Sequence, residues 1–133
     1  EARRAAALAR PLARRELGAR GRARGRPRDD ALRVATLATG RTGARPVVAE
    51  TYAAMLNAGL TPVVGEYGSL GCSGDLAPLA HCALAVMGEG TVRDATGALV
   101  PAAQALAAAG IEPVALREKE GLALINGTDG ILG

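Results

Sequence analysis

The chain has 133 residues, of which 49% are hydrophobic and only 2% aromatic, with no Phe or Trp. This is enough for one domain with a core of Ala, Leu and Val. No apolar run is long enough to cross a bilayer, the opening residues lack a signal-peptide pattern, and the two cysteines have no metal-ligand spacing. We therefore expect a cytoplasmic protein with no membrane partner and no metal.

The net charge of +3 is unevenly distributed. Residues 1–30 hold ten arginines and four acids, whereas the remainder holds six basic and nine acidic residues. Such an Arg, Gly and Ala segment cannot form a core, and it carries no aromatic residues that could stack on bases. We interpret it as a disordered end rather than a nucleic-acid-binding tail, so no nucleic-acid partner is expected.

Apolar spacing and Gly or Pro boundaries predict a mainly α chain. The predicted helices run from Asp29 to a stop at Gly40, over 46–59 with Pro46 at the first position, over 75–88, over 101–109, and onward from about Glu118. Residues 61–64 and 113–116 are predicted to be extended. Residues 89–100 are predicted to form a short β-hairpin around a turn at 94–97.

The most informative stretch is Gly68-Ser69-Leu70-Gly71-Cys72-Ser73-Gly74-Asp75, which leads into the helix predicted over 75–88. Its glycine spacing matches neither the dinucleotide-binding pattern nor a P-loop, and Ser73 is not in G-x-S-x-G. What remains is the tripeptide Cys72-Ser73-Gly74. An X-Ser-Gly backbone can cyclise, because Gly has no side chain that hinders attack by its nitrogen.

In that reaction the nitrogen of Gly74 attacks the carbonyl carbon of Cys72. One water is lost from the new ring, and a second is lost with the hydroxyl of Ser73. The product is 4-methylidene-imidazol-5-one (MIO), an electrophilic alkene made autocatalytically from the chain. Taken alone, the tripeptide is more typical of a loop serine that caps the next helix or hydrogen-bonds locally. It is the family resemblance of the surrounding motif that implies an MIO cofactor built from Cys72, Ser73 and Gly74, without a metal.

Residues 68–81 resemble the signature of the aromatic amino acid ammonia-lyases, the histidine ammonia-lyase family, in which the first residue of the tripeptide is usually Ala. The segments 119–128 and 39–46 are similar to two further motifs. The resemblance covers residues 31–133 and matches residues 1–30 poorly, so we expect that end to be disordered or aberrant. It implies a fragment of the helical ammonia-lyase fold with a glycine-rich MIO loop.

The resemblance also implies that Asn126, within an Asn-Gly-Thr motif, binds the MIO ring or the substrate; a turn-forming Asn is the alternative. His81 and Tyr67 are predicted to be packing residues rather than catalytic ones. Arg41 and Arg45 are predicted to be structural and to pair with acids elsewhere.

The function so implied is that of histidine ammonia-lyase, which converts L-histidine to trans-urocanate and ammonia. A phenylalanine or tyrosine ammonia-lyase, or an aminomutase, is the alternative within the family. The resemblance further implies a homotetramer, with the base, a Tyr, and the carboxylate-binding Arg in other segments. We therefore expect the 133-residue chain to be inactive alone.

Two alternatives lie outside the family. One is an inactive fragment or a basic-tailed binding module. The other is a thiol hydrolase that uses Cys72 and His81, which would need a hydrogen bond between those side chains.

Overall fold

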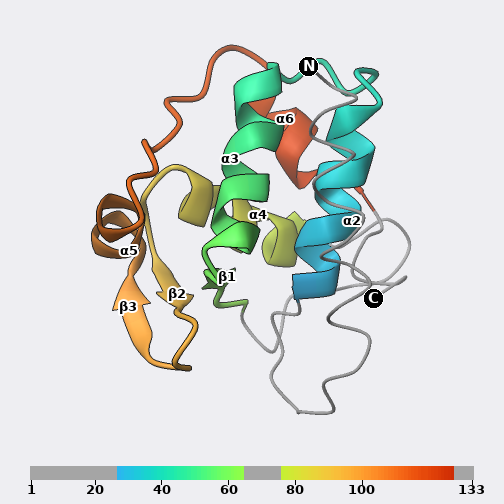
Figure 1. The fold of residues 1–133 in the computed structure, drawn as a ribbon. Coiled ribbons are helices and arrows are strands. Elements are labelled where there is room, and N and C mark those ends of the chain that lie inside the picture. The colour runs from blue at the N-terminus through green and yellow to red at the C-terminus, as the bar shows by residue number, and fades with distance from the viewer. Residues whose placement is uncertain (1–26, 65–75, 128–133) are drawn as a thin grey trace.

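The computed structural model describes residues 27–64 and 76–127 (Figure 1). Predictions that fall on residues 1–26, 65–75 and 128–133, the glycine-rich loop among them, lie outside the described residues. The elements in chain order are α2 (Pro27–Ala38), α3 (Pro46–Asn57), β1 (Thr61–Pro62), α4 (Leu76–Val86), β2 (Thr91–Arg93), β3 (Leu99–Pro101), α5 (Ala102–Ala108) and α6 (Glu120–Ile125). The mainly α prediction is confirmed.

Helices α2 and α3 pack against each other and run in opposite directions (Figure 1). Pro46 occupies the first position of α3, where its missing N–H costs no helical hydrogen bond. Gly59 ends α3 with a φ of +70°, and the N–H of Leu60 donates to Met55 O at 2.9 Å. This is the hydrogen-bonding pattern of a glycine-terminated helix. The predicted start at Pro46 is correct, and Gly59 is the stop, but the last helical residue is Asn57, two residues earlier than the predicted end.

Helix α4 lies at the centre of the fold and contacts α3, α5, α6 and β1. The apolar spacing over residues 75–88 predicts a single buried face made of Leu76, Leu79, Ala80, Ala83, Leu84 and Met87. In the structure, however, Leu76 is 43% exposed. The buried positions of α4 are Leu79, Cys82, Ala83, Ala85 and Val86. The prediction of the face was therefore partly wrong, because a helix with neighbours on several sides buries more than a single stripe.

The predicted hairpin is present, and it belongs to a three-stranded antiparallel sheet with the strand order β1-β2-β3. Its turn is held by Asp94, whose carboxylate accepts hydrogen bonds from the N–H groups of Thr96 and Ala98. The sequence predicted that Thr61 and Pro62 are extended but not that they pair with β2. Two residues, one of them Pro, carry too weak a pattern to predict strand pairing.

We predict that Gly59→Ala destabilises the end of α3 more than Gly40→Ala destabilises the end of α2. Both glycines have φ near +70°, so each substitution should cost about 1–2 kcal/mol in backbone strain. A Cβ at Gly59 would also lie 3.0 Å from Ala95 Cβ, whereas a Cβ at Gly40 meets nothing within 4 Å. Hydrogen exchange measures both losses, through the amides of residues 59 and 60 in the Gly59 variant and the amide of residue 40 in the Gly40 variant.

The additional Ala95→Gly substitution should restore part of the loss in Gly59→Ala, because it removes the atom that clashes. Equal losses in the Gly40 and Gly59 variants, with no restoration by Ala95→Gly, would show that α3 does not contact the hairpin turn in this way.

Candidate functional site

The structure describes only part of the predicted site. Cys72, Ser73 and Gly74, together with Tyr67, lie outside the described residues. Helix α4 begins at Leu76, two residues after Gly74. Asn126 follows the last residue of α6, and α6 packs against α4. The described contact between α6 and α4 therefore connects the helix that carries Asn126 with the helix that follows the tripeptide.

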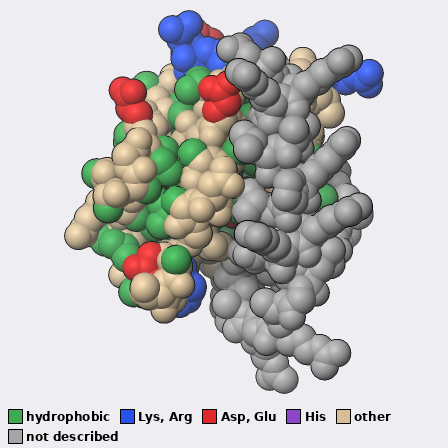
Figure 2. All heavy atoms as spheres, viewed as in Figure 1, with side chains coloured by type: hydrophobic (Ala, Val, Ile, Leu, Met, Phe, Trp, Pro, Cys, Tyr) green, Lys and Arg blue, Asp and Glu red, His purple; other side chains and the backbone are tan. Residues whose placement is uncertain are grey.

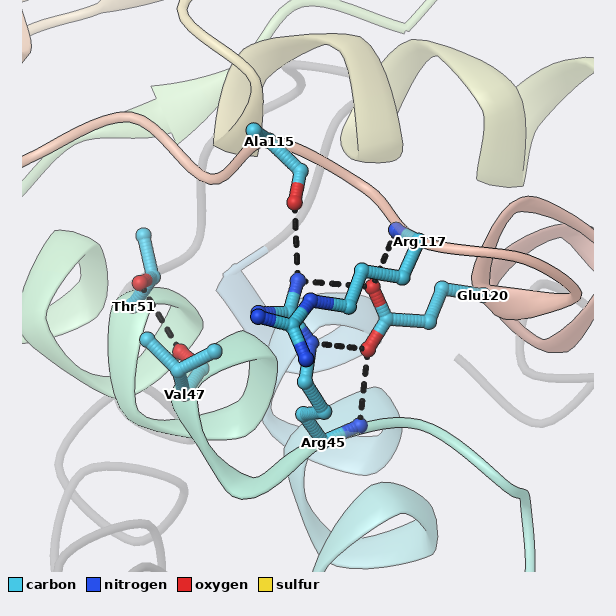
Figure 3. A network of polar contacts seen from close by, with 6 residues as sticks. All are labelled: Arg45, Val47, Thr51, Ala115, Arg117 and Glu120. Carbon is cyan, nitrogen blue, oxygen red and sulfur yellow. Dashed lines mark hydrogen bonds and ion pairs between the residues drawn. The ribbon is translucent and has the colours of Figure 1, made fainter.

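The N-terminal end of α6 is held by an ion pair between Glu120 and Arg45 (Figure 3). Arg45 Nε donates to Glu120 Oε1 at 2.8 Å, and Arg45 Nη2 donates to Oε2 at 2.9 Å. The backbone N–H of Arg45 donates to Oε1 at 3.0 Å, and that of Arg117 donates to Oε2 at 2.7 Å. Each carboxylate oxygen thus accepts two hydrogen bonds.

Arg45 precedes the first residue of α3, so this ion pair joins the beginnings of two helices. The Glu120 side chain is 2% exposed and that of Arg45 is 33% exposed. Arg45 Nη2 also donates to Ala115 O at 2.7 Å, which holds the segment that leads into α6 (Figure 3). The prediction that Arg45 pairs with an acid elsewhere is confirmed, with Glu120 as its partner.

The surroundings of Glu120 favour its ionised form. The side-chain hydrogen bonds from Arg45, aided by the backbone N–H groups of Arg117 and Arg45, lower the pKa of Glu120 from 4.5 to about 2. Burial opposes this shift but is the weaker effect. Glu120 is therefore a structural anion at neutral pH and not a candidate general base.

The C-terminal end of α6 is held by a second arginine, Arg33 of α2. Its side chain is only 1% exposed. Nη1 donates to Asn126 O at 2.8 Å and Nη2 donates to Ala123 O at 2.6 Å. A helix of six residues cannot satisfy its own last carbonyls, so Arg33 supplies donors that α6 itself lacks.

Asn126 ends α6 in an extended conformation, with φ −90° and ψ 117°. Its backbone N–H donates to Leu122 O at 3.2 Å, and its side chain is exposed in the described structure. A side-chain amide offers both donors and an acceptor. The contacts of α6 therefore fix the backbone of Asn126. The tripeptide 72–74 lies outside the described residues, so the structure gives no distance from it to the Asn126 amide.

Two other predicted residues are placed by the structure. His81 is half-buried on α4, as expected for a packing residue. Arg41 is exposed, and none of the described residues forms an ion pair with it. The sequence predicts the same pairing for Arg41 as for Arg45, and for Arg41 it stays a prediction.

Sequence reasoning missed Arg33. A signal was present, because Arg33 lies next to Val34 and four residues before Leu37, both of which are buried. An arginine at the edge of an apolar helical stripe is a candidate for a buried, hydrogen-bonded role.

Residues 31–133 match the sequence profile of the family named aromatic amino acid lyase. The chain belongs to this family. It is 68% identical over 102 residues to a histidine ammonia-lyase of Streptomyces coelicolor, a match that covers 77% of this chain and 20% of that protein. The chain therefore spans about a fifth of the length of this relative.

Two further comparisons show the spread of the family. The chain is 57% identical over 104 residues to an MIO-dependent tyrosine 2,3-aminomutase of Streptomyces globisporus, covering 77% of this chain and 19% of that protein. The crystal structure of histidine ammonia-lyase from Trypanosoma cruzi superimposes with a TM-score of 0.74 at 35% identity, covering 97% of this chain and 26% of that chain. The expected helical ammonia-lyase fold is confirmed.

Hydrophobic side chains also lie on the surface, over the face formed by α3, α5 and the hairpin (Figure 2). The most exposed large ones are Leu99 at 60% and Leu122 at 59%. Within the described residues, none of the helices combines the length and the apolar character needed to span a membrane.

We predict that Glu120→Gln costs about 3 kcal/mol at pH 7 in the full-length protein. This is the lower end of the range for removing one partner of a buried ion pair, because Arg45 remains partly exposed. The thermal unfolding midpoint measures the loss. Glu118→Gln is the matched control, since Glu118 is exposed two residues away, and it should leave the midpoint nearly unchanged.

The same pair predicts a pH dependence. The pKa of Glu120 is lowered on folding, so its stabilisation is complete above pH 4.5 and is lost as the pH falls toward 2. The wild-type midpoint should therefore fall between pH 5 and pH 3 more steeply than that of Glu120→Gln (roughly the window in which the unfolded carboxylate takes up its proton). Parallel pH profiles would contradict this account of Glu120.

Proposed function

We propose that the full-length protein carrying this chain is a histidine ammonia-lyase that eliminates ammonia from L-histidine and releases trans-urocanate. The observation that carries the proposal is the 68% identity to the Streptomyces coelicolor histidine ammonia-lyase over 102 residues. That matched length includes most of the chain beyond residue 30, and the chain contains both long motifs of the family, at residues 68–81 and 119–128.

The residues present fit an MIO group chemically. Cys72 contributes a carbonyl, Gly74 an unhindered backbone nitrogen and Ser73 a β-hydroxyl that can leave as water. Cys in place of the usual Ala leaves this chemistry intact, because the side chain of that residue takes no part in ring closure. When formed, MIO supplies an electrophile that ordinary side chains lack.

Asn126 is the residue of the described structure to which we assign a direct role in binding. Its carboxamide can donate a hydrogen bond to an oxygen of the ring or of the substrate and accept one from an amino group. The two arginine contacts that hold α6 support this assignment, since a binding group must be held by rigid neighbours. Glu120, ionised and fully hydrogen-bonded, holds the helix and takes no proton.

The alternative is a tyrosine-specific enzyme of the same family. The 57% identity to the MIO-dependent tyrosine 2,3-aminomutase favours it to a lesser degree than the 68% identity favours the histidine enzyme. The resemblance places the residues that choose the substrate in other segments, so the assignment of histidine depends on overall similarity rather than on a described contact.

We further propose that the full-length protein is a cytoplasmic homotetramer, as the resemblance implies. The exposed side chains of Leu99 and Leu122 are apolar surface that is available for contact with other parts of the whole protein. The 133-residue chain alone is expected to be inactive.

We predict that the full-length protein forms urocanate from L-histidine, with a kcat/KM roughly a hundredfold above that for tyrosine or phenylalanine. Ser73→Ala should lower kcat by about a thousandfold or more, because no β-oxygen is left to eliminate and the electrophile cannot form. Near-UV absorbance of urocanate measures turnover.

Cys72→Ala is the matched control, because the ring needs only the carbonyl of that residue, and it should remain nearly as active as the wild type. Coumarate or cinnamate formation without urocanate would overturn the histidine assignment. An inactive Cys72→Ala beside a fully active Ser73→Ala would overturn the MIO assignment and favour a thiol mechanism.

A further inference from the structure

We infer that Arg33 is a positioning residue for the reaction and that it acts through Asn126. This inference rests on the proposed function, because it takes the binding role of Asn126 from there. Arg33 and Asn126 are 93 positions apart in the sequence and belong to different helices, yet Arg33 Nη1 donates to Asn126 O at 2.8 Å.

Arg33 holds the last turn of α6 at two points. The guanidinium is a rigid planar fork, and its two terminal nitrogens bind the carbonyls of Ala123 and Asn126, at 2.6 and 2.8 Å. Two contacts three residues apart fix both the position and the rotation of the last turn of α6. The side-chain direction of Asn126 follows from that rotation.

Helix α6 does little to fix its own C-terminal end. Six residues are too few for a helix that is stable alone in water. The hydrogen bond from the N–H of Asn126 to Leu122 O is long, at 3.2 Å. The ion pair between Arg45 and Glu120 holds the opposite end, so loss of Arg33 should release the C-terminal turn and leave the N-terminal turn in place.

The burial of Arg33 has an energetic cost. Arg33 is almost completely buried, and a buried charge is costly compared with an apolar side chain of similar length. If this position only filled space in the core, an apolar side chain of similar length such as Met would be sufficient. A buried guanidinium with both terminal nitrogens directed at the end of one short helix therefore indicates a requirement for accurate placement of that end.

The test is a double-mutant cycle in the full-length enzyme, with Arg33→Met and Asn126→Ala made singly and together. With Asn126 present, Arg33→Met should lower kcat for L-histidine by about ten- to a hundredfold, the size of effect that a misplacement of about 1 Å produces. With Asn126→Ala in the background, the same substitution should lower kcat by no more than about twofold, because the residue through which it acts is absent.

A second measurement does not depend on activity. Hydrogen exchange should become faster in Arg33→Met for the amides of residues 124–127, while the amides of α3 and of the hairpin exchange as in the wild type. Arg41→Met is the matched control, since Arg41 is exposed in the loop that follows α2. It should change neither kcat nor exchange.

Equal losses of kcat from Arg33→Met in the two backgrounds would overturn the inference and assign Arg33 to stability alone. If Arg33→Met does not fold, the same double-mutant cycle is made with Arg33→Lys, and its result decides between positioning and stability alone. Lys keeps the charge but lacks the fork, so it should give a smaller loss that again disappears in the Asn126→Ala background. A wild-type enzyme without urocanate formation, or an Asn126→Ala variant with full activity, would instead contradict the proposed function.

Discussion

The described structure depends on the two arginines that hold α6 at its ends. Arg45, just before α3, binds the carboxylate of Glu120 at the first residue of α6. Arg33, within α2, binds the carbonyls of Ala123 and Asn126 at the last turn. A six-residue helix has too few internal hydrogen bonds to fix its own orientation. The antiparallel pair of α2 and α3 therefore sets where α6 lies, and α6 in turn carries the residue that we assign to binding.

This arrangement assigns anchoring and binding to different residues. Glu120 accepts hydrogen bonds at both oxygens and has a pKa of about 2, so it remains an anion and acts only as an anchor. Asn126 is neutral and exposed in the described residues, with its backbone fixed and its amide available. Because the anchoring groups are ionic and the binding group is neutral, the proposed site can be rigid without placing a fixed side-chain charge at the position of Asn126.

Much of the fold could be predicted from the sequence, since Gly and Pro mark helix ends through local backbone preferences. Gly40, Gly59 and Gly110 all have the positive φ expected of residues that follow a helix. The sequence could not predict which sides of α4 are buried or that Thr61 and Pro62 join the sheet, because both depend on distant neighbours. For the candidate site, the motifs identified the tripeptide and Asn126. The partner of Arg45 and the contacts of Arg33 could not be predicted, because in each case the two contacting residues are 75 or more positions apart in the sequence.

The central claim is that the α2–α3 pair holds α6 so that Asn126 lies at an MIO group formed from Cys72-Ser73-Gly74. A crystal structure of the full-length enzyme with urocanate bound tests it most directly. The account predicts a closed ring at residues 72–74, the amide of Asn126 within hydrogen-bonding distance of that ring or of the ligand, and Arg33 bound to the carbonyls of Ala123 and Asn126. An open tripeptide, or an Asn126 amide directed away from both ring and ligand while Arg33 keeps its contacts, would contradict it.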